Sequence, residues 1–225
     1  MALGLTALAP GAALAAFPAN INLGALNGTN GFRLSGVAAR DESGSAVSTA
    51  GDVNGDGVDD VLIGAPNADP NGGYSGASYV VFGGAGVGSG GKLELSTLDG
   101  TNGFRLSGVA AGDASGVAVS TAGDVNGDGV DDLLIGAPFT NPNGINSGAT
   151  YVVFGGAGVG AGGKLELSAL NGTNGFRLSG VAASDYSGVA VSTAGDVNGD
   201  GVDDLLIGAD RADPNGEFSG ATYVV

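Results

Sequence analysis

The sequence predicts an all-β protein composed of three tandem four-stranded β-propeller blades, which together make a partial or incomplete propeller. Three observations support this fold class. The nine residues Asp-Val-Asn-Gly-Asp-Gly-Val-Asp-Asp at 52–60 recur unchanged at 124–132 and 196–204, so the repeat period is 72 residues. Each period contains about four short β-branched or aromatic runs bordered by Gly, Pro or Asn, and no segment has the periodicity of a capped helix. Such repeats are typical of propeller blades, because the turns of a solenoid are shorter, roughly 20–45 residues.

The blades are assigned to residues 20–225, in blocks 20–91, 92–163 and 164–225. In the second copy we expect strand A at 117–121, strand B at 133–135, strand C at 150–154 and strand D at 104–106. The nine-residue acidic segment is then the A–B turn. In an up-and-down blade the A–B and C–D turns lie on one face, and the B–C and D–A turns lie on the other. The three acidic segments therefore share a face.

Residues 1–19 precede the repeats and have two interpretations. Ala13-Leu14-Ala15 resembles the small-residue cleavage site of a secretory leader, but no Lys or Arg precedes the apolar run. Alternatively, the segment is a degenerate strand, since residues 7–11 lie one period before the strand at 79–83. Pro10 and the low Leu content argue against a transmembrane helix, so we expect no membrane insertion.

The composition excludes several classes of protein. The chain has 47 Gly among 225 residues, but 43% of its residues are hydrophobic and only 13% are charged, which favours a folded chain over a disordered one. His and Cys are absent, so most nucleophile–base pairs are missing and we expect no enzymatic activity. The seven basic residues are scattered, so we expect no nucleic-acid partner.

The acidic residues are concentrated in the recurring segments, which we call loop 1 (52–60), loop 2 (124–132) and loop 3 (196–204). The formal net charge is −16, and the three loops, with four Asp each, hold 12 of the 23 acidic residues. Loop 1 offers side-chain oxygens from Asp52, Asn54 and Asp56 at alternate positions. The carbonyl of Val58 and the carboxylate of Asp60 follow at the same spacing. Oxygen donors in this arrangement, with Gly at the sixth position, predict a calcium loop.

Other metal sites fit this pattern less well. A helix–loop–helix calcium site needs a Glu at position 12, where this chain has Ile63, Ile135 and Ile207. Magnesium keeps several waters in a rigid octahedron, and transition metals prefer the His or Cys donors that this chain lacks. An Asn/Asp/Gly-rich hairpin can turn without metal, but three carboxylates within nine residues would then repel one another.

Three short motifs together resemble the FG-GAP repeat. They are Phe82-Gly83, loop 1 and Gly64-Ala65-Pro66. That repeat forms the blades of the integrin alpha-subunit N-terminal propeller and is similar to repeats in many bacterial surface proteins. The third copy departs from it, because it reads Gly208-Ala209-Asp210 without the proline and the sequence reaches Val225 before a third Phe-Gly. The resemblance implies one Ca²⁺ per loop, held by Asp52, Asn54, Asp56, Val58 and Asp60; by Asp124, Asn126, Asp128, Val130 and Asp132; and by Asp196, Asn198, Asp200, Val202 and Asp204.

The resemblance also implies a calcium-binding module that is extracellular, either secreted or at the cell surface, and that serves cell adhesion or binds a protein or glycan. The B–C and D–A turns differ between the copies, and their aromatic residues Tyr74, Phe139, Tyr186 and Phe218 are candidate ligand contacts. Ordinary loop packing is the alternative for these four. Two other functions remain open: a structural spacer in a repetitive surface protein, and a non-catalytic propeller attached to a secreted hydrolase. Closed propellers need about four or more blades, so the expected partners are further blades of a longer chain or a second copy arranged head to tail.

Overall fold

The computed structural model describes residues 19–225, and both interpretations of the leader-like segment concern residues that lie almost entirely outside this range. Short strands and turns make up the described chain, together with three-residue 3-10 helices at Leu23–Ala25, Leu95–Thr97 and Leu167–Ala169. Within residues 19–225 there is no helix long and apolar enough to cross a bilayer. The all-β prediction is therefore confirmed.

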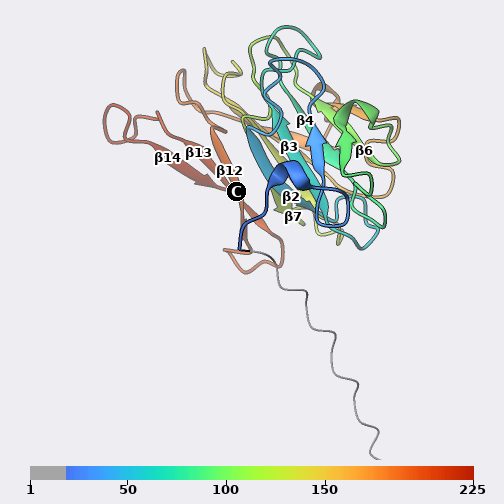
Figure 1. The fold of residues 1–225 in the computed structure, drawn as a ribbon. Coiled ribbons are helices and arrows are strands. Elements are labelled where there is room, and N and C mark those ends of the chain that lie inside the picture. The colour runs from blue at the N-terminus through green and yellow to red at the C-terminus, as the bar shows by residue number, and fades with distance from the viewer. Residues whose placement is uncertain (1–18) are drawn as a thin grey trace, which may run out of the picture.

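The strands form blades in the predicted A–B–C–D order. Blade 1 consists of β2 (Ala46–Gly51), β3 (Asp60–Ala65), β4 (Ala77–Val81) and β6 (Gly103–Ser107). Blade 2 consists of β7 (Ala118–Gly123), β8 (Asp132–Ala137), β9 (Ala149–Val153) and β11 (Gly175–Ser179). Blade 3 contains β12 (Ala190–Gly195), β13 (Asp204–Ala209) and β14 (Ala221–Val224). These neighbours pair antiparallel, and the A strands β2, β7 and β12 contact one another in sequence order, as Figure 1 shows.

A fifth strand, which the sequence analysis did not anticipate, extends the sheet of blade 1. It is β10 (Lys164–Glu166), which pairs parallel with β6 although it lies in the chain between β9 and β11 of blade 2. Asn71 of blade 1 helps to hold it, because the Asn71 side-chain amide donates to Glu166 Oε2 at 2.8 Å. The C–D connection of blade 2 therefore crosses to the outer edge of blade 1 before it returns.

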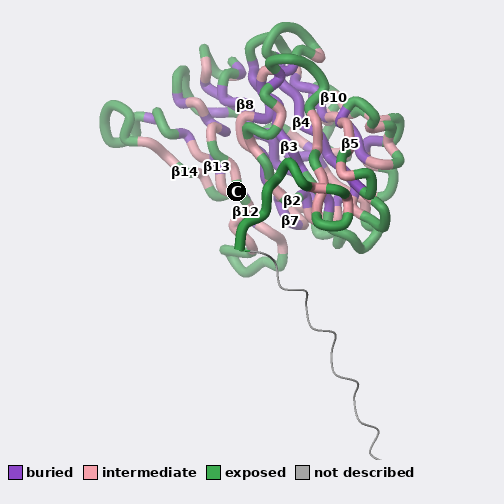
Figure 2. The backbone as a smooth tube through the Cα atoms, viewed as in Figure 1, coloured by how far each residue is buried: buried purple, intermediate pink, exposed green. Residues whose placement is uncertain are grey.

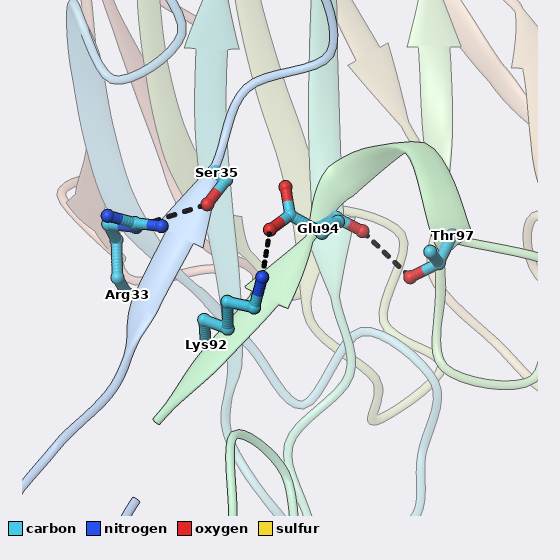
Figure 3. A network of polar contacts seen from close by, with 5 residues as sticks. All are labelled: Arg33, Ser35, Lys92, Glu94 and Thr97. Carbon is cyan, nitrogen blue, oxygen red and sulfur yellow. Dashed lines mark hydrogen bonds and ion pairs between the residues drawn. The ribbon is translucent and has the colours of Figure 1, made fainter. Parts of the chain in front are cut away.

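The same arrangement occurs one repeat earlier. There β5 (Lys92–Glu94) pairs parallel with β1 (Arg33–Ser35), a D-type strand that precedes blade 1. Figure 3 shows the polar contacts of this two-stranded sheet: Lys92 Nζ lies 3.4 Å from Glu94 Oε1, and Arg33 Nε donates to Ser35 Oγ at 3.2 Å. Thr97 Oγ1 donates to the carbonyl of Glu94 at 2.8 Å and so fixes the exit from β5.

The core lies between the blades, because alternate side chains of each strand point to opposite faces of its sheet. In β3, Leu62 belongs to the cluster that blade 1 shares with blade 2, whereas Ile63 packs on the other face beneath β1 and β5. In β8, Leu134 packs with Leu205 of blade 3. Figure 2 shows the buried residues concentrated along these strands and the exposed ones along the connecting turns. Neighbouring blades thus share their hydrophobic core.

The glycines of the Gly-Ala-Pro segments lie where neighbouring blades meet. A Cβ on Gly64 would lie 2.1 Å from the carbonyl oxygen of Gly116, and a Cβ on Gly136 would lie 2.0 Å from that of Gly188. Only glycine leaves room for such a close backbone approach. Asp210, which replaces the proline in the third copy, does not change the strand exit, since β13 ends at Ala209 as β3 ends at Ala65.

Candidate metal centres

The three candidate metal loops connect strands A and B, as predicted. In blade 1 the register of β2 against β3 shifts between Thr49 and Gly51, and Gly51 then pairs with Asp60. Position 9 of the loop therefore lies next to position 1. The same shift occurs in blades 2 and 3, with Gly123 opposite Asp132 and Gly195 opposite Asp204. The hairpin thus brings the two ends of each loop together.

The first aspartate of loop 1 lies at its centre. Asp52 Oδ1 accepts the N–H of Asp56 at 2.9 Å, and Asp52 Oδ2 accepts the N–H of Gly57 at 2.7 Å. Asp56 Oδ1 in turn accepts the N–H of Val58 at 2.9 Å. Gly57 has φ +88°, which side-chain-bearing residues rarely adopt. Loop 2 repeats these contacts through Asp124 and Asp128, so the turn is wrapped around its own acidic oxygens.

The aspartate at position 9 joins the loop to strand C. Asp60 is only 1% exposed; its Oδ1 accepts the N–H of Gly83 at 2.7 Å and its Oδ2 that of Val53 at 3.1 Å. Burial raises the pKa of Asp60 to about 6 against the effect of these hydrogen bonds, and the carboxylates of Asp56 and Asp52 raise the pKa further. Three acidic groups therefore interact within one loop.

Loop 2 has the same arrangement. Asp132 is fully buried, accepts N–H groups from Gly155 at 2.8 Å and Val125 at 3.1 Å, and burial raises its pKa to about 6. In loop 3 the bonds differ: Asp204 Oδ1 accepts the side-chain amide of Asn198 at 3.1 Å, and Asp204 Oδ2 accepts the N–H of Val197 at 2.8 Å. The amide of Asn198 therefore takes the place that the glycine N–H has in the other loops.

The donor atoms of the three loops are of the type that calcium prefers, but the loops do not yet place them around a common point. Every candidate donor is an oxygen, and loops 1 and 2 keep their acidic groups close enough to repel one another. However, the described residues contain no group of three Asp, Glu, His or Cys side chains that is close enough to hold a metal. The side-chain oxygens at positions 1, 3 and 5 instead accept loop N–H groups, as Asn54 Oδ1 does from Asp56 at 2.8 Å.

The opposite face holds the four aromatic candidates, and the structure brings two of them together. Phe139 and Tyr186 meet edge-on with ring centroids 5.5 Å apart, although they come from different blades. Arg211 lies over the Tyr186 ring at 4.5 Å, and Asn146 Nδ2 donates to the Tyr186 hydroxyl at 3.3 Å. The sequence analysis missed Arg211 and Asn146, since only their place in equivalent turns could have indicated them.

The other two aromatic candidates stand apart. Tyr74 and Phe218 occupy equivalent B–C positions, are each 59% exposed, and have φ of 56° and 53°. Tyr186 also has a positive φ of 56°. Bulky residues seldom adopt this conformation, but Asn146, at the position equivalent to Tyr74 and Phe218 in the second copy, has φ 53° as well, so the conformation belongs to the turn.

Comparison with known proteins identifies the repeat. The model of the FG-GAP repeat matches residues 43–81, 115–153 and 187–225, which together make up more than half of the chain. The chain belongs to the FG-GAP repeat family. Integrin alpha-PS2 of Drosophila melanogaster is 36% identical over 137 residues, which cover 57% of this chain and 9% of that protein. Integrin alpha-PS5 of the same species is 31% identical over 165 residues (73% and 14%), and integrin alpha pat-2 of Caenorhabditis briggsae is 30% identical over 185 residues (74% and 13%). The chain therefore matches less than a sixth of the length of these relatives.

Phe82 and Gly83 each have a structural role in this chain. The N–H of Gly83 binds Asp60, and a Cβ at Gly83 would lie 2.3 Å from the carbonyl oxygen of Asp59. Phe82 packs against Phe104 of strand D, with ring centroids 5.8 Å apart. Phe82-Gly83 therefore links the end of strand C both to loop 1 and to the core.

Proposed function

We propose that this chain is an extracellular FG-GAP β-propeller module, secreted or at the cell surface, that binds Ca²⁺ in loops 1, 2 and 3 and serves adhesion by binding a protein or glycan. One observation carries the calcium part. Within residues 19–225 the one ion pair joins Lys92 and Glu94, so none of the loop aspartates is neutralised by a basic side chain. A buried carboxylate beside two others is unfavourable unless a cation compensates the charge.

Each ion would take the oxygens implied by the family pattern, namely the side chains at positions 1, 3, 5 and 9 and the carbonyl at position 7. Three divalent ions would change the formal net charge of −16 to −10. Because the donors come from both ends of the A–B hairpin, the ion would hold the two strands together, and its binding would stabilise the fold. Asp60 and Asp132 would extend this stabilisation to the end of strand C, because they also accept the N–H groups of Gly83 and Gly155.

Calcium should therefore raise the melting temperature. At a free concentration one hundred times Kd, one site adds about 2.7 kcal/mol to the free energy of unfolding. We expect thermal unfolding to move up on addition of CaCl₂, to reverse with EGTA and to respond weakly to MgCl₂. The matched control is the triple variant Asp56→Asn, Asp128→Asn, Asp200→Asn, whose melting temperature should be insensitive to calcium. An equal melting temperature in millimolar calcium and in EGTA would disprove calcium binding as a stabilising function.

The adhesion part concerns the face opposite the loops. Phe139 and Tyr186 present adjacent aromatic surface there, with the guanidinium of Arg211 beside them. We expect the double variant Phe139→Ala, Tyr186→Ala to lower binding to cells or to a glycan array at least tenfold, because aromatic side chains often contribute most of the binding energy in such contacts. Val197→Ala, an exposed residue in loop 3, is the control on the other face. If the double variant binds as well as the Val197→Ala control and the wild type, Phe139 and Tyr186 serve only to pack the turns.

Two alternatives remain compatible with the fold. A structural spacer in a repetitive surface protein would bind calcium but no ligand, and a non-catalytic propeller attached to a secreted hydrolase would bind a ligand through a longer chain. The proposal gives this chain no catalytic role. It includes neighbours for blade 3, either further blades of a longer chain or a second copy arranged head to tail, because no D strand pairs with β14 among residues 19–225.

A further inference from the structure

The aspartate at position 8 of each loop is outside the metal-binding pattern, but in loops 2 and 3 it contacts the loop of the preceding blade. Asp131 Oδ2 of loop 2 accepts the backbone N–H of Asp52 in loop 1 at 2.8 Å. Asp203 Oδ2 of loop 3 accepts the backbone N–H of Asp124 in loop 2 at 3.0 Å. In both cases the donor is position 1 of the preceding loop. The same contact therefore occurs at both interfaces between described blades.

Backbone contacts support each of these hydrogen bonds. The N–H of Asp203 donates to the carbonyl of Asp124 at 3.3 Å, so residues 124 and 203 are joined twice. At the first interface, the N–H of Gly156 in blade 2 donates to the carbonyl of Val53 at 2.9 Å. Positions 1 and 2 of a loop are thus held by the next blade as well as by their own hairpin.

The glycines before loops 1 and 2 make room for this aspartate. A Cβ on Gly51 would lie 2.2 Å from Asp131 Oδ2, and a Cβ on Gly123 would lie 2.0 Å from Asp203 Oδ2. Gly195, which has the same φ within a few degrees, has nothing within 4 Å. The contact at Gly51 and Gly123 is therefore made by the following blade and is not a property of the hairpin itself.

We propose that Asp131 and Asp203 are positioning residues that couple neighbouring metal loops, so that calcium binding in one loop depends on the next blade. This inference rests on the proposed calcium function. Asp52 is the first ligand of loop 1, and its backbone N–H and carboxylate belong to the same residue. A hydrogen bond to a carboxylate is stronger than one to a neutral acceptor. The bond from the Asp52 N–H to Asp131 therefore restricts the backbone of Asp52, and so the position of the Asp52 carboxylate that would bind the ion.

Asp59, the position 8 residue of loop 1, is a matched control. It has the same local sequence as Asp131 and Asp203, but it is exposed, whereas they are half-buried. Among residues 19–225 no preceding loop reaches Asp59, and its side chain makes no hydrogen bond there. Replacing Asp59 removes one acidic group from loop 1 without removing a contact between blades.

The test uses the whole chain with calcium as the only ligand, and it follows the backbone amides of each loop by NMR. In EGTA, Asp131→Ala should speed hydrogen exchange of the Asp52 amide about tenfold or more, as expected for the loss of one charge-assisted hydrogen bond.

In a calcium titration, Asp131→Ala should weaken the calcium affinity of loop 1 severalfold, although loop 1 itself is unchanged in sequence. Asp131→Asn keeps an acceptor and should restore most of the loop 1 affinity. Asp59→Ala should leave loops 2 and 3 unaltered.

The outcomes separate this inference from the proposed function. If the wild type binds no calcium, the proposed function fails, while exchange of the Asp52 amide still reports whether the contact exists. If Asp131→Ala speeds exchange but leaves the calcium affinity of loop 1 unchanged, the contact is only structural and the coupling is overturned. If Asp131→Asn keeps the Asp52 amide protected from exchange but weakens loop 1 as much as Asp131→Ala, the effect is one of charge and the positioning role is overturned. Asp203→Ala, read out at loop 2, repeats the test at the second interface.

Discussion

Replacing Gly136 by Ala should destabilise the protein by about 3 kcal/mol, which corresponds to a fall in melting temperature of roughly 6–12 °C. The added Cβ would lie 2.0 Å from the carbonyl oxygen of Gly188, which enters blade 3. Gly188 cannot easily move away, because its N–H donates to the carbonyl of Gly208 at 2.9 Å. The φ of Gly136 is not in the left-handed region, so the cost is steric. Thermal unfolding at a fixed calcium concentration measures it.

Gly208 provides the control for this prediction, since it lies in β13, whose sequence Leu-Leu-Ile-Gly-Ala is the same as that around Gly136 in β8. A Cβ on Gly208 would meet nothing closer than the Cβ of Ala190 at 3.3 Å. We expect Gly208→Ala to change the free energy of unfolding by less than about 1 kcal/mol, because glycine within a strand is itself unfavourable by roughly that amount. Equal effects at the two positions would mean that blades 2 and 3 do not pack as described.

Replacing Phe104 by Ala should cost about 3–5 kcal/mol, the range for a large buried aromatic side chain. Phe104 is 0% exposed, lies 5.8 Å from Phe82 between ring centroids, and covers the backbone of Gly160, where a Cβ would lie 2.0 Å from Phe104 Cγ. Truncation leaves a cavity between blades 1 and 2, because the ring lies between Phe82 of blade 1 and the backbone of Gly160 in the connection of blade 2. Urea unfolding at constant calcium should show a lower midpoint with an unchanged slope.

The equivalent residue Phe32 is the control for Phe104→Ala. It lies just before β1 and is only half-buried, so Phe32→Ala should cost clearly less. The two phenylalanines share the surrounding sequence Gly-Phe-Arg-Leu-Ser, which removes differences in strand propensity from the comparison. A similar loss at both positions would contradict the conclusion that the main core lies between the blades.

The sequence could predict the strand order and the place of the loops because both depend on local patterns. Alternation of apolar residues marks the strands, and the loop of nine residues lies between two of them in every copy. The FG-GAP family match confirms this part. Calcium binding stays a prediction, because the described geometry places the oxygens of Asp52 and Asp56 on loop N–H groups.

The features that were not predicted depend on contacts between distant segments. Nothing in Lys164-Leu-Glu166 identifies β6 as its partner, and three residues are too short to show a periodicity. The acceptor role of Asp131 toward Asp52 is hidden for the same reason, since Asp59 has an identical local sequence and no such contact. Of the four aromatic candidates, only Phe139 and Tyr186 meet. The sequence does not indicate this contact, because it depends on how turns of neighbouring blades pack.

The parallel fifth strand has a consequence for solubility. Identical copies of a sheet can pair with one another between molecules, most readily through long, uncharged outer strands. In this chain the outer edge of blade 1 is not the five-residue β6 but the three-residue β10, which carries an exposed Lys164 and a half-buried Glu166. Since the edge beyond β6 is already occupied by a segment that leads back into blade 2, another molecule finds only a short, charged strand to pair with. The fifth strand thereby limits aggregation through the outer edge of blade 1.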